Sequence, residues 1–244
     1  MKTSKPFLPT LIEQIIDFID IFHQSRISRF FSKKNLDILI DIGAHKGEFT
    51  IHMLKNNNLK KIYLFEAQSS VFKKLKENLE PYQKNLSAYN IALNSYDGVA
   101  TFYENILSST SSFKQTSNSS WVTFKKTVLG SKDIIKSQVD IETYKFDTVY
   151  ISSEKKIDQI MPDENSLFKI DVEGCELDVL KGADEFITKR IPKYIQIEEN
   201  TFNIYQIDDR VAVRKFLKDR GYIRKKSFLF PLCNFKDIIY QRSN

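Results

Sequence analysis

The sequence has few of the residues that build disulfide scaffolds, metal knuckles or membrane spans. Its two cysteines, Cys175 and Cys233, are too few and too far apart for a disulfide framework, so we expect both to be free thiols in a reducing compartment. No apolar run approaches the roughly 20 residues of a spanning helix. The first ten residues also lack the apolar core and cleavage site of a signal peptide. We therefore expect a soluble, cytoplasmic protein.

The composition is that of a globular protein with one sizeable core. Of 244 residues, 41% are hydrophobic and 28% are charged, which excludes disordered and fibrous classes. The net charge of +6 is a modest basic excess that favours anionic partners. It does not single out nucleic acid, because the chain has no Asn/Asp-Pro-Pro-Tyr/Phe motif and no dense basic stripe. We expect no nucleic-acid partner.

From Asp37 onward, short apolar runs alternate with amphipathic stretches. Strands are predicted at 37–43, 61–67, 87–93, 166–172 and 193–199, followed by a C-terminal pair at 222–230 and 237–241. Helices are predicted at 47–57, 70–79, 174–190 and 208–222, where apolar residues recur every three or four positions. This alternation is typical of an α/β fold whose mostly parallel sheet carries helices on both faces. We assign residues 36–244 to this domain.

Residues 105–131 interrupt the alternation. They are rich in Ser, Thr and Asn without a sustained period, which indicates a long inserted loop. The single tryptophan, Trp121, lies in this loop beside Lys125 and Lys126. We interpret the loop as a lid over a substrate, with simple disorder as the alternative.

Residues 1–35 are predicted to form an amphipathic helical extension. Its apolar stripe consists of Leu11, Ile12, Ile15, Ile16, Ile19 and Phe22. Packing on the domain or on a second subunit explains the stripe, and the helix is thus the candidate contact for a homo-oligomer. Membrane attachment, aided by Arg26, Arg29, Lys33 and Lys34, is the alternative. We do not expect it, because Glu13, Asp17 and Asp20 lie in the same helix.

The first strand ends in a turn that is suited to a nucleotide-like ligand. Asp41 precedes the turn, which contains Gly43, Ala44, His45 and Gly47 and offers backbone N–H groups at a helix start. Its spacing is G-x-x-x-G, not the G-x-G-x-x-G of dinucleotide folds. This favours a ligand with an amino acid moiety, whose ammonium Asp41 would balance. Glycines in such turns are also simply structural.

The second and third strands end in further cofactor candidates. Glu66 follows Gly43 by 23 residues, near the spacing at which an acid binds ribose hydroxyls. Ala67 comes next in the same turn. After the third strand, Asn90 and the small Ala92 would lie beside an adenine ring. An exposed acid at a strand end is the alternative explanation for Glu66.

The fourth and fifth strands end in an unusual concentration of charge. Lys169, Asp171 and Glu173 occupy alternate positions, and Glu198 ends the next strand. Buried parallel strands are normally continuous apolar runs, so these charges need an explanation. We interpret them as catalytic candidates at the ligand-binding edge of the sheet. A structural salt-bridge cluster is the alternative.

Several segments together resemble a known family. DIGAHKGEFT, LFEAQSSVFKKLKENL, NIALNSYDGVATFY, SLFKIDVEGCELDVLKGA and IQIEEN, in this order, resemble the FkbM family of S-adenosylmethionine-dependent methyltransferases over residues 36–223. The resemblance implies the class I methyltransferase fold, a Rossmann-like seven-stranded sheet with one antiparallel strand. It also implies methyl transfer to a hydroxyl, often of a sugar or polyketide, with many members in bacterial polysaccharide clusters.

The chain departs from the family pattern at several positions. His45 stands where Asn is usual, Ala67 and Ser69 where prolines are usual, and Lys145-Phe146 where Thr-Leu precedes the shared Asp. His45 bears on cofactor contacts, and the others bear on loop stiffness and packing. The acidic and glycine positions of the pattern are all present.

Methyl transfer to a hydroxyl is helped by a base at the edge of the fourth strand. Asp171 is the first choice by position, followed by Glu173 or Glu198. A divalent cation held by two of these carboxylates is an alternative activator, although the sequence itself predicts no metal site. The acceptor is expected to be a small molecule or glycan.

Two other functions compete with the methyltransferase hypothesis. A nicotinamide-dependent oxidoreductase would use Tyr-x-x-x-Lys, present as Tyr222 to Lys226. That pair is predicted to lie along a strand, where the two groups are too far apart to cooperate. The other competitor is a non-catalytic nucleotide-binding scaffold with the same fold.

Overall fold

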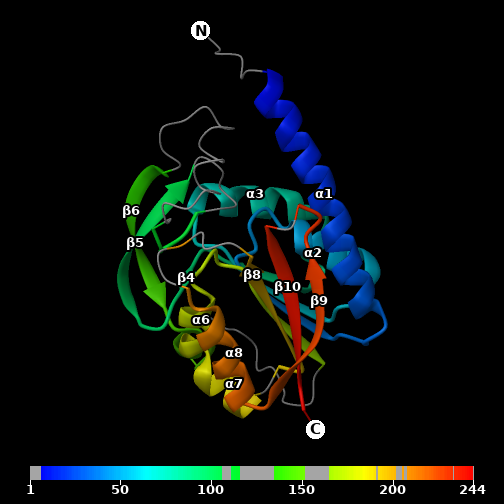
Figure 1. Cartoon of the computed structure of the whole chain (residues 1–244), viewed down its shortest axis with the longest axis vertical. Helices are drawn as coiled ribbons and strands as arrows, with labels where there is room; N and C mark the ends of the chain where they lie inside the picture. The colour runs from blue at the N-terminus through cyan, green and yellow to red at the C-terminus, as the bar shows by residue number, and fades with distance from the viewer. Residues whose placement is uncertain are drawn as a thin grey trace.

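The computed structural model describes residues 7–105, 111–115, 135–151, 165–190, 192–201, 205, 208–232 and 234–243. A long helix, α1 (Phe7–Ser32), precedes the alternating part of the chain and projects from it at its N-terminal end (Figure 1). The main-sheet strands are β1 (Ile38–Ile42), β2 (Lys61–Phe65), β3 (Leu86–Tyr89), β7 (Ser166–Ile170), β8 (Tyr194–Asn200), β9 (Tyr222–Leu229) and β10 (Phe235–Arg242). The helices between strands are α2 (Glu48–Asn56), α3 (Ser69–Leu79), the 3-10 helix η1 (Glu80–Asn85), α5 (Phe146–Ile151), α6 (Glu176–Gly182), α7 (Asp184–Arg190) and α8 (Arg210–Asp219).

The seven strands form one sheet in the order β3-β2-β1-β7-β8-β10-β9. All neighbouring pairs are parallel except those of β10, which runs antiparallel to both β8 and β9. Every residue of β1 and β7 is buried, because helices cover both faces of the sheet centre. The predicted α/β fold with one antiparallel strand is confirmed.

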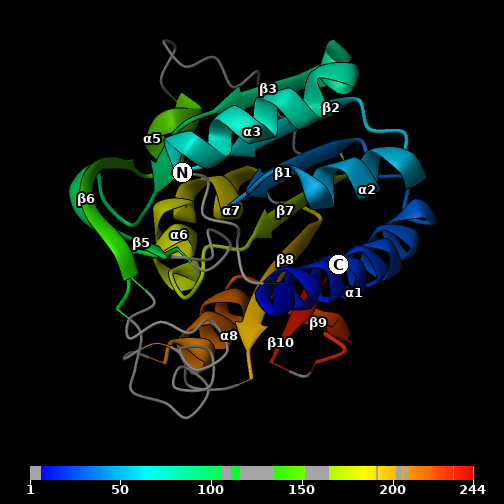
Figure 2. The ribbon, with the colours of Figure 1, turned by 90° about the horizontal axis from the view of Figure 1, so that it is seen from above.

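The two faces of the sheet have separate apolar cores. Helices α1, α2 and α3 cover one face, and α5 to α8 cover the other (Figure 2). Side chains alternate between these cores along each strand. In β1, for example, Leu39 packs towards α1 and α2, whereas Ile38 and Ile40 pack towards α5 to α8. Asp41 follows the same alternation and therefore lies on the face that α1 and α2 cover.

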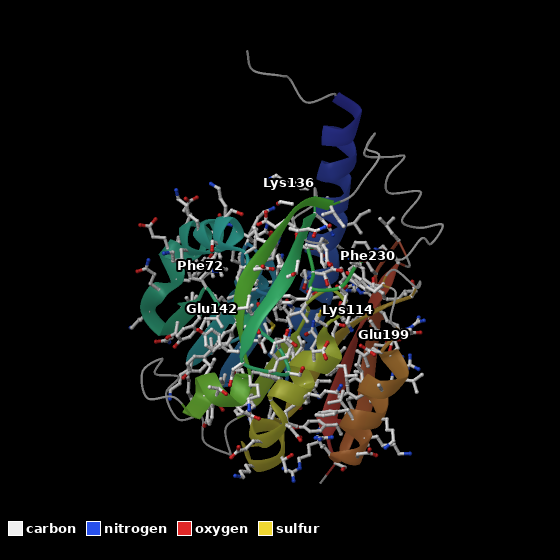
Figure 3. The ribbon with its side chains drawn as sticks, turned by 90° about the vertical axis from the view of Figure 1, so that its left-hand side faces the viewer. Phe72, Lys114, Lys136, Glu142, Glu199 and Phe230 are labelled. Atoms are coloured by element: carbon white, nitrogen blue, oxygen red, sulfur yellow. The ribbon has the colours of Figure 1, made fainter. Side chains whose placement is uncertain are left out.

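A second sheet of three strands was not predicted. It consists of β4 (Ala92–Leu93), β5 (Gly98–Asn105) and β6 (Ile135–Tyr144), in the order β4-β6-β5. The long strands β5 and β6 form a curved ribbon on one side of the domain, with Lys136 and Glu142 on β6 (Figure 3). The prediction of one strand over 87–93 is wrong, because the chain leaves the main sheet after Tyr89 and Ala92 pairs with Thr143 of β6.

Helix α1 packs on the domain through the C-terminal part of its length. Its fully buried side chains include His23, Ile27 and Phe31, and Ile19, one turn before His23, is partly buried. Of the predicted stripe, the side chains from Leu11 to Ile16 lie outside the described residues, and Phe22 is 56% exposed and does not pack on the domain. Contact of the stripe with a second subunit stays a prediction.

Most of the predicted lid lies outside the described residues, including Trp121, Lys125 and Lys126. Of its residues, Asn105 ends β5, and 111–115 form a short segment that bridges back to Tyr103. Cys233 is also outside the description, whereas Cys175 is a free, buried thiol. Within the described ranges, no helix is both long and apolar enough to cross a membrane.

Candidate active site

The candidate residues meet at the carboxyl ends of β1, β2, β7 and β8. In open α/β sheets, ligands bind outside this edge of the parallel strands. The β1 and β7 strands are adjacent, so Asp41 pairs in register with Lys169. The β7 and β8 strands are adjacent as well, which places Glu198 of β8 beyond the last paired residues of β7. Because these strands are neighbours in the sheet, the polar residues that follow them lie together at its carboxyl edge.

The turn after β1 approaches its neighbours closely. Gly43 has φ +76°, and a Cβ on it would lie 1.8 Å from the carbonyl oxygen of Asp171. The amides of Gly43 and Ala44 both donate to the carbonyl of Phe65, at 3.0 Å. The backbone amide of His45 donates to the carboxylate of Glu66 at 3.0 Å.

This turn does not present the open row of donors that the sequence predicts. Its amides already donate within the protein, since β1 and β2 are adjacent and the turn folds against the end of β2. Gly47 closes the turn as the left-handed residue before α2, and its amide donates to the carbonyl of Ala44 at 2.9 Å. The glycines thus set the shape of the site by allowing close backbone approach.

A buried ion network joins β1 to β7. The Nζ of Lys169 lies 3.0 Å from Oδ1 of Asp41 and 3.1 Å from Oδ2 of Asp171. Thr50 donates to the other oxygen of Asp41 at 2.8 Å. Burial alone would lower the pKa of Lys169, but the charges of Asp171 and Asp41 raise it above its usual value. Lys169 is therefore a permanent cation within this network.

The network changes the interpretation of Asp41. The predicted partner of its carboxylate was a ligand ammonium, whereas in the structure its two oxygens face Lys169 and Thr50. Its side chain has no exposed surface. The reason is the strand register, which places Lys169 directly beside it. Asp41 acts on the site through Lys169, which holds Asp171.

Three carboxylates converge beyond the ends of β7 and β8. Asp171, Glu173 and Glu198 each offer an oxygen within 4.8 Å of the others. Glu173 is not part of the strand, because β7 ends at Ile170 and Glu173 has φ +54°. These residues lie close together, as predicted. The chain turns after Ile170, however, so the strand does not extend to residue 172 as predicted.

The electrostatics of this acidic cluster favour protonation of one or more members. Burial, followed by the charges of Asp171 and Glu173, raises the pKa of Glu198 well above its usual range. Burial also raises the pKa of Asp171, against the opposing charge of Lys169. Its side chain is 26% exposed, so a ligand can reach it. A carboxylate with a raised pKa is a better proton acceptor than an ordinary one.

Two residues of the cluster's surroundings were missed by the sequence analysis. The hydroxyl of Tyr205 donates to Oε2 of Glu173 at 2.6 Å, and its ring packs on Gly174. Glu176 accepts from the amide of Gly174 at 2.9 Å, and burial raises its pKa to about 7. Tyr205 belongs to no sequence motif, so no local pattern points to it. Glu176 could have been noticed as an acid between the apolar residues Cys175 and Leu177 at the start of the predicted helix.

A second group of hydrogen-bonded side chains lies on the face of the main sheet that α1 covers. His23 of α1 bonds Oδ2 of Asp237 through Nε2 at 2.7 Å, and Gln196 donates to Oδ1 of the same carboxylate at 2.7 Å. Asp237 pairs in register with Glu198 across β10 and β8. His23 is fully buried. The contact with Asp237 could not be predicted, because the two residues are 214 positions apart.

Glu66 lies at the end of β2, as predicted, and is buried. Its two oxygens accept from the amides of His45, at 3.0 Å, and Gln68, at 2.8 Å. Burial raises the pKa of Glu66, against the lowering effect of these hydrogen bonds. Two lone pairs beyond these bonds leave the carboxylate able to accept from ligand hydroxyls.

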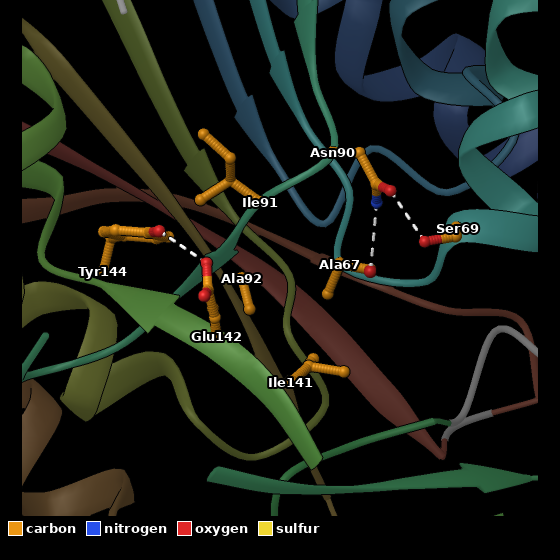
Figure 4. Close-up of a pocket in the computed structure, with 8 residues that line it drawn as sticks. All are labelled: Ala67, Ser69, Asn90, Ile91, Ala92, Ile141, Glu142 and Tyr144. Carbon is orange, nitrogen blue, oxygen red and sulfur yellow. Dashed lines mark hydrogen bonds between the residues drawn. The ribbon is translucent and has the colours of Figure 1, made fainter. Parts of the chain in front are cut away.

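A pocket of about 320 Å³ lies beside Glu66, between the ends of β2 and β3 and strand β6 (Figure 4). It is lined by Ala67, Ser69, Asn90, Ile91, Ala92, Ile141, Glu142 and Tyr144. Asn90 is fixed by hydrogen bonds to the carbonyl oxygens of Glu66 and Ala67 and by the hydroxyl of Ser69. Three predicted cofactor residues, Ala67, Asn90 and Ala92, thus share one pocket. Its far wall, from the unpredicted second sheet, was missed.

The described part of the predicted lid contacts the acidic cluster. Ser112 donates to the backbone carbonyl of Glu173 at 2.6 Å. Lys114 forms ion pairs with Asp178 and Asp209. These contacts place residues 111–115 against the site.

The residues of the oxidoreductase signature do not form a pair. Tyr222 and Lys226 both belong to strand β9. The hydroxyl of Tyr222 is buried and donates to the carbonyl of Pro192 at 2.6 Å. The predicted strand is confirmed, and the pair that a reductase needs one helical turn apart is not formed.

Comparison with solved structures identifies the fold. A methyltransferase FkbM from Methylobacillus flagellatus KT is similar with a TM-score of 0.53 at 15% identity, over 85% of this chain and 44% of that chain. The chain thus spans less than half the length of that protein. Magnesium protoporphyrin IX methyltransferase from Synechocystis PCC 6803, solved with bound SAM, is similar with a TM-score of 0.53 at 8% identity, over 100% of this chain and 87% of that chain. The fold is that of class I methyltransferases.

Sequence comparison identifies the family. No curated protein is similar enough in sequence to count as a match. The family model described as the Methyltransferase FkbM domain matches residues 41–224, which contain the turn after β1, Glu66, the pocket and the acidic cluster. This match covers most of the chain and confirms the resemblance drawn from the sequence motifs. The chain belongs to the FkbM methyltransferase family.

Proposed function

We propose that the protein transfers the methyl group of S-adenosylmethionine to a hydroxyl of a sugar, a polysaccharide precursor or another small natural product. The observation that carries this proposal is that one edge of the sheet holds both a pocket beside a buried acid and a cluster of three carboxylates. The pocket is suited to a nucleoside, and the carboxylate cluster is suited to an acceptor that must lose a proton. Family membership supports the same chemistry.

The residues present fit S-adenosylmethionine. The pocket is bounded by the small side chains of Ala67 and Ala92, which leave room for a planar base. Glu66 directly precedes Ala67 of the pocket wall, and its remaining lone pairs would accept from the ribose hydroxyls. At Gly43, any side chain would clash with the carbonyl oxygen of Asp171, so glycine allows the turn after β1 to pack directly against the end of β7. When bound, the cofactor supplies an electrophilic methyl group on a sulfonium.

Asp171 has the position and environment of a general base. Its carboxylate is partly exposed at the site, and Lys169 holds one of its oxygens at 3.1 Å. With S-adenosylmethionine bound to supply the methyl group, Asp171 would accept the proton that the acceptor hydroxyl loses. Such proton transfer typically contributes a factor of about 10² to 10⁴ in rate. Most of the remaining rate enhancement comes from alignment of the acceptor and exclusion of water.

The other carboxylates are placed to orient a polyhydroxylated acceptor. Glu173 is fixed by the hydroxyl of Tyr205. Glu198, with its raised pKa, is protonated more readily and can then donate a hydrogen bond as well as accept one. A group of neighbouring donors and acceptors suits the vicinal hydroxyls of a sugar. This supports a glycan-type acceptor.

The same carboxylates offer an alternative activator. Asp171, Glu173 and Glu198 are oxygen ligands of the type that Mg²⁺ prefers. A cation there would acidify the acceptor hydroxyl in place of a base. The ion pair of Asp171 with Lys169 favours the base, because the ammonium already partly neutralises one of the three ligands.

Calorimetric titration tests the cofactor assignment. Purified protein is titrated with S-adenosylmethionine, S-adenosylhomocysteine and NAD in parallel. Saturable binding of the first two without NAD binding supports the proposal. Binding of NAD alone would instead support the oxidoreductase, and binding of S-adenosylmethionine without methyl transfer to any hydroxyl acceptor would support the non-catalytic scaffold.

A further inference from the structure

Exposed apolar side chains gather where α1 meets the turn between β9 and β10. The two segments touch there: Arg26 donates to the carbonyl of Leu229 at 3.2 Å, and the ring of His23 contacts the ring of Phe230. Of the ten exposed large apolar side chains in the described chain, three lie in α1 and one in the turn: Phe18, Ile21 and Phe22, and Leu232. We call these four residues the apolar patch. Leu229, the last residue of β9, is also exposed, but it pairs with Lys236 on the face of the sheet that α8 covers. Clustered exposed apolar residues mark interaction sites.

Basic residues follow the apolar patch along α1. Residues 18–34 contain four basic side chains and one acid, Asp20, and are preceded in the same helix by Glu13 and Asp17. The basic residues are Arg26, Arg29, Lys33 and Lys34, and Lys226 of β9 lies on the same side of the sheet, over the ring of Phe228. Arg26 lies over the rings of both Phe22 and Phe228, which joins the basic and apolar groups in one surface.

The one acid of residues 18–34 is withdrawn from this surface. Asp20 accepts from Gln24 at 3.3 Å and is half-buried, and burial raises its pKa to about 6. Its electrostatic neighbours are His23, Asp171 and Glu48, which lie on the inner side of α1. The sequence argument against membrane attachment counted Glu13, Asp17 and Asp20. The structure turns Asp20 towards the inner side of α1, and Lys226 of β9 adds a cation over the ring of Phe228, which packs on α1. The side chains of Glu13 and Asp17 lie outside the described residues.

We propose that the apolar patch and the basic residues that follow it bind the surface of an anionic lipid bilayer. Aromatic and aliphatic side chains would enter the headgroup boundary while the lysines and arginines attract the anionic headgroups. A second copy of the chain is a poorer occupant. A two-fold contact would bring the same cations of both copies together. This proposal is independent of the proposed methyl transfer.

Vesicle flotation tests the proposal with the full chain. The protein is mixed with vesicles of phosphatidylcholine alone or of phosphatidylcholine with phosphatidylglycerol. Binding is expected only to the second, and high salt should weaken it because the attraction is electrostatic. Phe18→Ser combined with Phe22→Ser should weaken binding at least about tenfold. Arg29→Ser should weaken it about fivefold.

Val211→Ser is the matched control. Val211 is 73% exposed on α8, outside the patch, so its replacement should leave vesicle binding unchanged. All these positions are exposed, and melting temperatures will confirm that the variants fold. No binding to the anionic vesicles would overturn the proposal, as would equal losses in the patch and control variants. A dimer in sedimentation equilibrium that the Phe18 and Phe22 changes dissociate, without vesicle binding, would assign the patch to a second copy instead.

Discussion

The ammonium of Lys169 lies 3.0 Å from the carboxylate of Asp41 on the neighbouring strand, and both side chains are almost fully excluded from solvent. The same ammonium lies 3.1 Å from Asp171, at the site. A buried pair of this kind is weak evidence for stability in itself, because desolvation offsets much of the attraction. Because Lys169 also contacts Asp171, the pair fixes the position of the Asp171 side chain. Loss of either partner would leave a buried charge without compensation.

Lys169→Met should therefore destabilise the protein by about 3–5 kcal/mol, because Asp41 would remain as an uncompensated buried charge. Urea unfolding measures this change. Lys189→Met is the matched control, since Lys189 forms an exposed ion pair with Glu185 and its loss should change stability by less than about 0.5 kcal/mol. Equal small effects of both substitutions would show that the network adds nothing to the fold.

The main sheet was predictable because its signal is local. The central strands are continuous apolar runs and the covering helices are amphipathic, so element type and order follow from sequence. The second sheet was not predictable for the opposite reason. Strand β6 is largely exposed, with only Thr143 fully buried, so it has no apolar alternation. Its partner β5 is separated from it by the long segment that starts after Asn105.

The sequence predicted those site residues that belong to recognisable motifs. Glu66, Asn90 and Asp171 follow strands of the predicted sheet, and strand order alone brings them to one edge. The partners of these residues were not predictable, because they come from distant segments with no motif. Tyr205 donates to Glu173 from a position 32 residues further along the chain, and Glu142 lines the pocket from β6. The pairing of Lys169 with Asp41 depends on strand register, which the sequence does not state.

Glu66→Ala should weaken binding of S-adenosylhomocysteine by about 1.5–3 kcal/mol, the range for hydrogen bonds to a charged group. The expected loss has two sources: the ribose contacts, and the hydrogen bonds that hold His45 and Gln68. Calorimetry gives the affinity. Glu77→Ala, at an exposed acid that pairs with Lys74, is the control and should bind normally. Unchanged affinity in folded Glu66→Ala would remove Glu66 from the cofactor site.

Ala67→Leu should fill the pocket beside Glu66. The larger side chain would occupy the space assigned to the adenine ring, so affinity for S-adenosylhomocysteine should fall at least about tenfold. The melting temperature should change little, because the pocket is open to solvent. Ala212→Leu, on the exposed side of α8, serves as the control. If Ala67→Leu binds as tightly as the wild type, the base must lie elsewhere.

Glu176 should make the protein less stable as pH rises. Its folded pKa of about 7 lies above the usual 4.5, so the folded state binds its proton more tightly than the unfolded state does. The resulting stability is complete below pH 4.5 and is lost as pH rises through about 7, by up to about 3 kcal/mol.

Chemical denaturation across this pH range measures the slope for Glu176. Glu176→Gln should flatten it, since a glutamine has no proton to lose. Glu77→Gln, the same change at an exposed acid, should leave the slope of the wild type. A Glu176→Gln profile that parallels the wild type would show that the folded pKa of Glu176 is ordinary.

The most direct test of the account is transfer of a labelled methyl group from S-adenosylmethionine to a panel of sugar acceptors, by wild-type protein and by Asp171→Asn, with and without chelator. If Asp171 is the base, the variant should fold and bind S-adenosylmethionine but lose transfer by about a hundredfold or more, and chelator should have no effect. Loss of wild-type transfer with chelator, restored by Mg²⁺ or Mn²⁺, would assign the carboxylates to a metal instead. Full transfer by Asp171→Asn, insensitive to chelator, would contradict the central role given to Asp171.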